Sequence, residues 1–292
     1  MMVKVLLDTD IGTDVDDAVC LAYLLAQPEC ELLGITTVTG EAEKRASLAS
    51  ALCQFAGRDV PIYPGADQPL KGQQRQLIAH QATALQGWPH QTKFPQGEAI
   101  NFLRRMIHTH PGEVTLLTIG PLTNIGQLFS EDPEVPRLLK ALVMMGGVYN
   151  QESPEWERIE WNVCGDPFAT QIVFRAPLRV QRALGLDVTQ QVVMPAEEVR
   201  ARFSAPLLRP VLDFAEIWFA GFYPAITFHD PLAAATLFDQ TLCAFEKGTV
   251  TIDMLEQPGR TFYHPGGEES PHQIAVSVNP QRYFEHFFSV FR

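Results

Sequence analysis

The sequence predicts an α/β protein, a single domain built on a mostly parallel sheet with helices on both faces. Three observations lead to this prediction. Short runs rich in leucine or β-branched residues alternate along the chain with segments of helical periodicity. The 292 residues are 46% hydrophobic and 19% charged, which is enough apolar surface for one large core. No internal repeat, low-complexity tract or linker-like change of composition divides the chain, so we expect residues 1–292 to form one domain.

The expected elements alternate between strand and helix. In order, they are a strand at residues 3–7, a helix at 16–27, a strand at 32–38, a helix at 41–55, a strand at 114–119, a helix from 122 and a strand at 141–145. Gly120 and Pro121 stop one strand and start the next helix. This alternation implies a doubly wound, Rossmann-like sheet with right-handed crossovers. Residues 64–96, rich in Gln, Gly and Pro, and residues 147–161 lack the pattern and are predicted to be loops.

The composition argues against several classes of partner. Lys and Arg number 22 against 34 Asp and Glu, a formal net charge of −12, and such a surface repels nucleic-acid polymers and anionic membranes. The apolar stretch at 214–228 is interrupted and too short to cross a bilayer. The five cysteines are scattered without the spacing of a zinc site or disulfide framework, and the N-terminal residues reach carboxylates too early for a signal peptide. We therefore expect a cytoplasmic protein.

A dense group of carboxylates lies where the first strand becomes the first helix. Residues 8–18 read DTDIGTDVDDA and contain Asp8, Asp10, Asp14, Asp16 and Asp17. One acidic residue at a helix N-terminus stabilises the helix by about 0.3–1 kcal/mol, which does not offset the repulsion among five carboxylates. In a doubly wound fold this turn lies at the carboxyl edge of the sheet, where ligands bind, so we expect a cation to neutralise it.

The ligand chemistry of this group favours a hard metal. All candidate ligands are oxygens, so calcium is expected and magnesium comes second. An EF-hand is excluded because Gly12 falls at the wrong position and no bidentate Glu follows at the required distance. The metal could be structural, or it could lower the pKa of a bound water whose proton a neighbouring carboxylate removes. The acidic run alone leaves both possibilities open.

Three further motifs are weak when each is taken alone. His229 and Asp230 precede an Ala-rich helical segment, and the short blocks 160–162 (EWN) and 120–124 (GPLTN) also fit loops and helix caps. Their order along the chain carries more information than their composition.

Taken together, the motifs resemble the inosine-uridine type nucleoside hydrolases over nearly the full chain. The matching blocks are the opening aspartate run with its DDA ending, GITTVTG at 34–40, GPLTN at 120–124, MMGG at 144–147, EWN at 160–162 with Asp166-Pro167, LDVT at 186–189 and HDP at 229–231. The resemblance implies a nucleoside hydrolase fold, a single catalytic domain and a role in purine and pyrimidine nucleoside salvage. It also implies a small nucleoside substrate, a Ca²⁺ cofactor and a homodimer or homotetramer.

The resemblance also implies roles for individual residues. The Ca²⁺ ligands carried over are Asp10, Asp17, the main-chain carbonyl of Ile119 and Asp230, with Asp14 as a further possible ligand. Asp10 would also be the general base, Asp16 would bind ribose hydroxyls, and Glu160 and Asn162 would hold the 5′ end. These roles agree with the chemistry, because N-glycosidic cleavage passes through a ribosyl cation that carboxylates stabilise. The leaving base must gain a proton or hydrogen bond, and His229 is the candidate acid because imidazole titrates near neutral pH.

The chain departs from the family pattern in three places. The opening motif is two residues longer, so either Asp14 or Asp16 could take the role that is assigned here to the other. Glu41 replaces an Asn that commonly contacts ribose, and it is retained here as a substrate-binding candidate that accepts but cannot donate a hydrogen bond. Gln190 stands where a His is frequent.

Aromatic residues cluster at 214–228. Core packing is the prediction for most of them, and Trp218 and Phe222, one helical turn apart, are expected to form a buried stripe. Tyr223, beside Pro224, is the better candidate for contact with a nucleobase, and Trp161 is a candidate for contact with the sugar.

Two alternatives remain at this stage. The first is a phosphatase of the haloacid dehalogenase type, with Asp8 as nucleophile and magnesium as cofactor, although Asp14, Asp16 and Asp17 have no place in that mechanism. The second is a non-catalytic, calcium-dependent binder of nucleosides or sugars, which the Glu41 departure keeps open.

Overall fold

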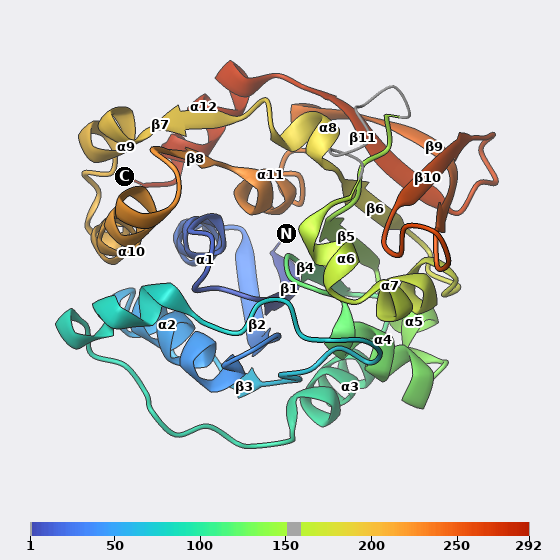
Figure 1. Cartoon of the computed structure of the whole chain (residues 1–292), viewed down its shortest axis with the longest axis horizontal. Helices are drawn as coiled ribbons and strands as arrows, with labels where there is room; N and C mark the ends of the chain where they lie inside the picture. The colour runs from blue at the N-terminus through green and yellow to red at the C-terminus, as the bar shows by residue number, and fades with distance from the viewer. Residues whose placement is uncertain (1, 151–158, 292) are drawn as a thin grey trace.

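A large, mostly parallel sheet runs through the molecule (Figure 1). The computed structural model describes residues 2–150 and 159–291. Within them the main sheet has the strand order β10-β9-β11-β6-β5-β4-β1-β2-β3. Its strands are β1 (Val3–Thr9), β2 (Cys30–Thr37), β3 (Ile62–Pro64), β4 (Val114–Thr118), β5 (Ala141–Met145), β6 (Gln181–Leu184), β9 (Cys243–Ile252), β10 (Thr261–Pro265) and β11 (His272–Val278). Neighbours from β11 to β3 pair in parallel, whereas β9 pairs antiparallel with β10 and β11. The predicted fold class is confirmed.

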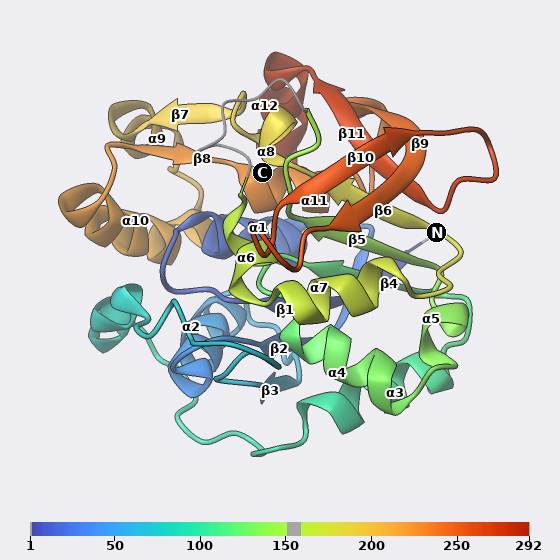
Figure 2. The same ribbon diagram turned by 45° about the vertical axis from the view of Figure 1, so that its right-hand side comes forward.

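Two apolar cores cover the two faces of this sheet. Successive residues of β1 alternate between them: Val5 and Leu7 belong to one core and Leu6 to the other. Because both faces are covered, the central strands read as continuous apolar runs. Figure 2 shows α3 and α4 on one side of the sheet and α11 and α12 on the other.

The helices divide between the two cores. The first core includes residues of α1 (Asp16–Ala26), α2 (Ala42–Phe55), α9 (Ala196–Arg202), α10 (Arg209–Gly221), α11 (His229–Ala235) and α12 (Pro280–Ser289). The second includes residues of α3 (Ala99–Thr109), α4 (Thr123–Glu131), α5 (Val135–Leu138) and α7 (Pro167–Phe174). Three short helices lie in the connections between these elements: the 3-10 helix η1 (His80–Gly87) between β3 and α3, α6 (Trp161–Gly165) between β5 and α7, and α8 (Leu186–Thr189) after β6. A small separate sheet pairs β7 (Val193–Pro195) with β8 (Ala225–Thr227).

The expected strands and helices agree with these bounds to within a few residues. Of the two expected loops, residues 64–96 contain η1, and residues 151–158 of the second loop lie outside the described part of the chain. All five cysteines are buried and free, as expected. In the described part of the chain, we find no helix with the length and apolarity needed to cross a membrane.

A buried histidine in this scaffold is expected to make folding stability sensitive to acid. His272, at the start of β11, is 3% exposed; its Nδ1 accepts from the Val250 N–H at 2.8 Å and its Nε2 donates to the Phe174 carbonyl at 2.9 Å. This arrangement needs the neutral ring, and burial lowers the pKa of His272. A depressed folded-state pKa stabilises the fold fully above the unfolded pKa, about 6.5, and the stabilisation is lost as the pH falls below it.

The measurement is the free energy of unfolding in urea at pH 7.5 and pH 5.5. The advantage of the wild type over His272→Gln is expected to shrink on acidification, by up to about 1.4 kcal/mol per pH unit. His264→Gln, on the exposed part of β10, is the matched control and should show no such change. An equal wild-type advantage at both pH values would contradict the prediction.

Candidate active site

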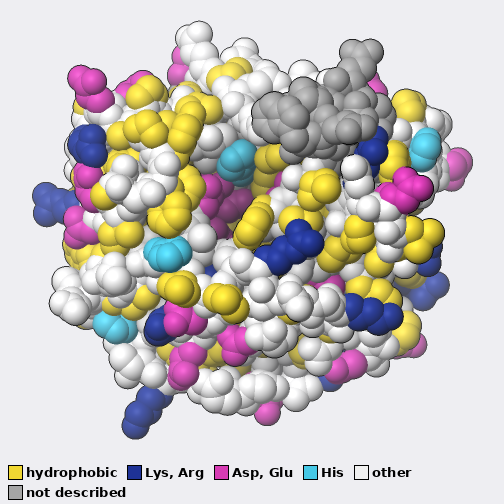
Figure 3. Space-filling model, viewed as in Figure 1, with side chains coloured by type: hydrophobic (Ala, Val, Ile, Leu, Met, Phe, Trp, Pro, Cys, Tyr) yellow, Lys and Arg dark blue, Asp and Glu magenta, His cyan; other side chains and the backbone are white. Residues whose placement is uncertain are grey.

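A cavity of about 540 Å³ opens at the carboxyl end of the parallel strands. Asp10 follows β1, Ile119 follows β4, Met145 ends β5 and Leu186 lies just after β6, and all four residues line the cavity. Figure 3 shows a hollow on this face with acidic side chains inside it and hydrophobic side chains around it. This is the edge at which doubly wound sheets bind their ligands.

The loop between β1 and α1, together with the first turn of α1, supplies most of the acidic side chains of the cavity. Gly12 turns the backbone with φ 123°, and a Cβ at this position would lie 2.7 Å from Leu48 Cδ1, so the turn requires glycine. Thr9 Oγ1 accepts from the Ile11 N–H at 3.1 Å and donates to Asp17 Oδ1. The loop is therefore held in one conformation by its own short side chains.

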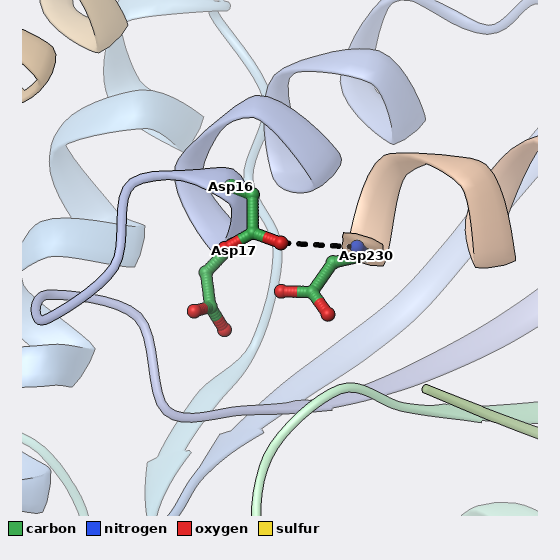
Figure 4. Close-up of side chains that lie close together, drawn as sticks. All are labelled: Asp16, Asp17 and Asp230. Carbon is green, nitrogen blue, oxygen red and sulfur yellow. Dashed lines mark hydrogen bonds between the residues drawn. The ribbon is translucent and has the colours of Figure 1, made fainter. Parts of the chain in front are cut away.

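Three buried carboxylates meet between the starts of α1 and α11 (Figure 4). Asp16, Asp17 and Asp230 each offer an oxygen, and these oxygens lie within 4.8 Å of one another. The Asp230 N–H donates to Asp16 Oδ2 at 3.1 Å, which links the two helix starts directly. The structure thus brings together Asp17 and Asp230, two of the expected metal ligands, and adds Asp16 to them.

The electrostatics of this site call for a cation. Burial, reinforced by mutual repulsion, raises the pKa values of Asp16, Asp17 and Asp230 well above their usual range. Burial also raises the pKa of Asp10, and it raises that of Asp14 to about 6. Across residues 2–150 and 159–291, the only lysine or arginine that is fully buried is Arg45, which donates to the main-chain carbonyls of Asp10 and Gly40. One guanidinium does not balance this many carboxylates, so the all-oxygen donor set fits a hard divalent ion.

Asp10 lines the same cavity but lies outside the close group of three. Its Oδ2 accepts from Gln76 Nε2 at 2.8 Å, and its charge raises the pKa values of Asp16, Asp17 and Asp230. The Ile119 carbonyl accepts from Asn162 Nδ2 at 3.0 Å. Asp10 and Ile119, the other two predicted Ca²⁺ ligands, therefore both line the cavity.

The EWN block forms the start of α6 and one wall of the cavity. Glu160 caps this helix: its carboxylate accepts from the N–H groups of Asn162, Val163 and Gly147 at 2.7, 2.9 and 3.1 Å. Burial raises the pKa of Glu160 to about 7. Trp161 also lines the cavity and is 50% exposed. The EWN motif therefore serves both as a helix cap and as part of the cavity wall.

His229 lies at the cavity wall beside the group of three carboxylates. Its Nδ1 is 2.7 Å from Thr189 Oγ1 on α8, and the described residues provide no hydrogen-bond partner for its Nε2. Burial lowers the pKa of His229 to about 4, so the ring is uncharged at neutral pH.

Two expected substrate contacts are not brought to the cavity. Both Glu41 carboxylate oxygens are engaged elsewhere, one by the Lys44 ammonium and the other by the Ala79 N–H at 3.0 Å, and Glu41 does not line the cavity. Tyr223 is 53% exposed and likewise lies outside the lining.

The aromatic lining comes instead from Trp218 and Phe222, whose rings stack with centroids 5.2 Å apart. The expected buried stripe is wrong for Phe222, which is 53% exposed, because α10 ends at Gly221. The glycine and the nearby Pro224 were the signal in the sequence for that helix end.

Gln76 and Thr13 are the polar residues of the cavity that sequence reasoning missed. Gln76 comes from the 64–96 segment, where glutamine is common and nothing in the sequence distinguishes this one. Met145, Ile159 and Leu186 were missed as apolar lining residues.

Asp8 is not available for chemistry. It is fully buried, its Oδ2 accepts from Thr36 Oγ1 at 2.5 Å and Asn124 Nδ2 at 2.7 Å, and it does not line the cavity. A phosphatase nucleophile must reach its substrate, so the dehalogenase-like alternative is wrong on this point.

Comparison with known proteins agrees with the motifs. A family model described as inosine-uridine preferring nucleoside hydrolase matches residues 5–285. The chain is 30% identical to probable uridine nucleosidase 1 of Oryza sativa subsp. japonica, covering 86% of this chain and 81% of that protein. It is 28% identical to the inosine-uridine preferring nucleoside hydrolase of Crithidia fasciculata, covering 96% and 95%.

A solved structure shares the fold. The purine-preferring ribonucleoside hydrolase from Gardnerella vaginalis superimposes with a TM-score of 0.82 at 24% identity, covering 99% of this chain and 98% of that one. The resemblance seen in the motifs is thus confirmed over nearly the whole chain. This protein belongs to the inosine-uridine preferring nucleoside hydrolase family, whose members are metal-dependent enzymes.

Proposed function

We propose that this nucleoside hydrolase cleaves the N-glycosidic bond of ribonucleosides to free base and ribose, using a water that Asp10 deprotonates beside a Ca²⁺ site. The observation that carries this proposal is the meeting of Asp16, Asp17 and Asp230 in the cavity that Asp10 also lines. The names of the relatives, which include uridine nucleosidase and inosine-uridine preferring nucleoside hydrolase, support ribonucleosides as substrates.

The proposed Ca²⁺ ligands are Asp10, Asp17, Asp230 and the Ile119 carbonyl, with Asp14 as a further possible ligand. Buried oxygens with excess negative charge support this choice, because calcium takes oxygen ligands and several carboxylates. When bound, the ion supplies the field that lowers the pKa of a coordinated water.

Asp10 is the proposed general base. It lines the same cavity as the group of three carboxylates, where a water held beside the ion would lie within reach of its carboxylate. The water proton passes to Asp10, and the water oxygen bonds to the anomeric carbon as the carbon–nitrogen bond breaks. The electron pair of that bond remains on the base nitrogen, and the surrounding carboxylates stabilise the positive charge that develops on the ribosyl ring.

The remaining cavity residues are proposed to hold the two ends of the nucleoside. Asp16 accepts hydrogen bonds from ribose hydroxyls, and Glu160 and Asn162 hold the 5′ end. Trp218 and Phe222 offer aromatic faces for the base, and Trp161 lies beside the sugar. His229 is proposed to assist the leaving base. Because its ring is uncharged at neutral pH, it does so by hydrogen bonding through Nε2.

The test is a panel of purine and pyrimidine nucleosides incubated with the protein and Ca²⁺, with free base and ribose separated by chromatography. We expect release that stops on chelation and returns with added Ca²⁺. Nucleoside binding without release would support a non-catalytic binder, and phosphate release from phosphomonoesters would support a phosphatase. The homodimer or homotetramer remains a prediction that sedimentation would check.

Calcium is also expected to stabilise the fold. A ligand that binds only the native state adds about 2.7 kcal/mol at 100 times its Kd, which for a chain of 292 residues raises Tm by roughly 4–5 °C. Calorimetry of chelated protein with and without Ca²⁺ measures the shift. Asp230→Asn should abolish most of it, whereas Glu285→Gln, an exposed carboxylate on α12, should retain it. An undiminished shift in Asp230→Asn would remove Asp230 from the metal site.

A further inference from the structure

Gln76 is buried where its neighbours are not. It is 7% exposed, while Leu77 and Ile78, the next two residues, are 61% and 52% exposed. Turning an uncharged polar side chain inward and apolar ones outward is unfavourable unless the polar group finds partners. The partners of this amide therefore explain its position.

The Gln76 side chain joins three segments of the cavity. Its Nε2 donates to Asp10 Oδ2 at 2.8 Å and to Thr13 Oγ1 at 2.7 Å, both in the loop after β1. Its Oε1 accepts from the indole N–H of Trp161 at the start of α6. Both amide hydrogens and one oxygen lone pair are thus used, and each bond ends on a residue that lines the cavity.

The backbone around Gln76 is also fixed by contacts with neighbouring segments. Gln74 Oε1 accepts from the Gln76 N–H and from Thr39 Oγ1, each at 2.9 Å. The Gln76 carbonyl lies so close to Gly40 that a Cβ on that glycine would be 2.5 Å from the oxygen. The turn at residues 39–40 and the 64–96 segment therefore fit together only because residue 40 is glycine.

An amide suits this position for an electrostatic reason. Asp10 faces a site where positive charge must gather, first as a divalent ion and then as a ribosyl cation. A lysine or arginine in place of Gln76 would hold the carboxylate equally well, but its charge would oppose both cations. A neutral donor fixes the orientation of the carboxylate and leaves its full negative charge in the cavity.

We propose that Gln76 is a positioning residue of the hydrolysis reaction: its amide, itself held by the Trp161 indole N–H, fixes the orientation of the Asp10 carboxylate, so that the chemical step depends on it. The inference rests on the proposed function of Asp10 as the base. Small losses of alignment at a base lower the rate of the chemical step more than they weaken substrate binding.

The experiment compares Gln76→Met, which keeps the length of the side chain but removes its hydrogen bonds, with Gln73→Met, the same change at an exposed glutamine of the same segment. For Gln76→Met we expect kcat to fall by about 10- to 100-fold while KM changes by less than about threefold. Gln76→Met is expected to lower Tm, because three buried hydrogen bonds are lost, so kcat is compared well below Tm and at saturating Ca²⁺. A merely structural role would, under these conditions, leave kcat close to that of the control or raise KM together with the loss of kcat.

Two further variants keep the test decisive if Gln76→Met folds poorly. Gln76→Glu keeps the acceptor for Trp161 but sets a carboxylate against Asp10, so its kcat should fall at least as far. Trp161→Phe removes the indole donor together with part of the aromatic surface that lines the cavity, so it should raise KM and lower kcat less than either Gln76 variant. A kcat of Gln76→Met within twofold of the control, in an active wild type, overturns this inference alone. A wild type that releases no base from any nucleoside overturns the proposed function, and this inference with it.

Discussion

Replacing Asp10 by asparagine is expected to lower kcat by about 10³- to 10⁴-fold with a much smaller change in KM. General-base catalysis contributes about 10²- to 10⁴-fold, and the change also removes a charge that stabilises the ribosyl cation. Asparagine has nearly the same shape, and its oxygen can still accept from Gln76 Nε2, so the loop should keep its conformation. Initial rates of base release at saturating nucleoside and Ca²⁺ measure the loss.

Asp8→Asn is the matched control for Asp10→Asn, because Asp8 is two residues away and buried but outside the cavity. Its accepting oxygen can be kept, since Thr36 and Asn124 both donate to Oδ2. We expect this variant to keep kcat within about threefold of the wild type. Near-normal turnover by Asp10→Asn would remove Asp10 from the role of base, and a large loss in Asp8→Asn alone would reopen the question of which aspartate reacts.

Four of the parallel strands, β1, β2, β4 and β5, were predictable because they are covered on both faces. The apolar runs of β1, β4 and β5 follow from that burial, and the helices between them carry clear start and stop signals. The parallel strands β3 and β6, of three and four residues, were not predicted. The antiparallel strands β9 to β11 were not predicted. β9 alternates between buried and exposed residues, such as Gly248 and Val250 against Thr249, and this weaker pattern was not identified in a region without helices.

The part of the candidate site whose residues lie close together in the sequence was predictable. The aspartates of the β1–α1 loop stand together in the chain, and Asp230 was found through its motif rather than by any signal of proximity. Gln76, in the irregular chain before η1, and the stacked pair of Trp218 and Phe222, at the end of α10, reach the cavity only through tertiary packing, which leaves no local pattern. Glu41 shows the converse: comparison with the family pattern made it a candidate for ribose, whereas its carboxylate accepts from Lys44 and the Ala79 N–H and does not line the cavity.

The neighbouring aspartates Asp16 and Asp17 are expected to fail in different ways when each is changed to asparagine. Asp16 Oδ2 is occupied by the Asp230 N–H, whereas Asp17 Oδ1 is held by Thr9. If Asp17 binds Ca²⁺ and Asp16 binds ribose, Asp17→Asn should weaken Ca²⁺ binding, and excess Ca²⁺ should restore part of its activity. Asp16→Asn should lose at least about 10²-fold in kcat/KM with no restoration, because the lost contact is to the substrate.

Calcium titrations of activity and of Tm on both variants separate the two roles, and the comparison is sharp because the two residues share burial, charge and helix position. Both belong to the close group with Asp230, so proximity alone assigns either of them to the metal. Removing a metal ligand lowers the affinity for Ca²⁺, and a higher Ca²⁺ concentration can offset this loss by mass action. Removing a substrate contact leaves Ca²⁺ binding unchanged, so added Ca²⁺ has no effect. If calcium restores Asp16→Asn and not Asp17→Asn, the roles are exchanged, and the two-residue extension of the opening motif has moved the metal ligand one position toward the start of the helix.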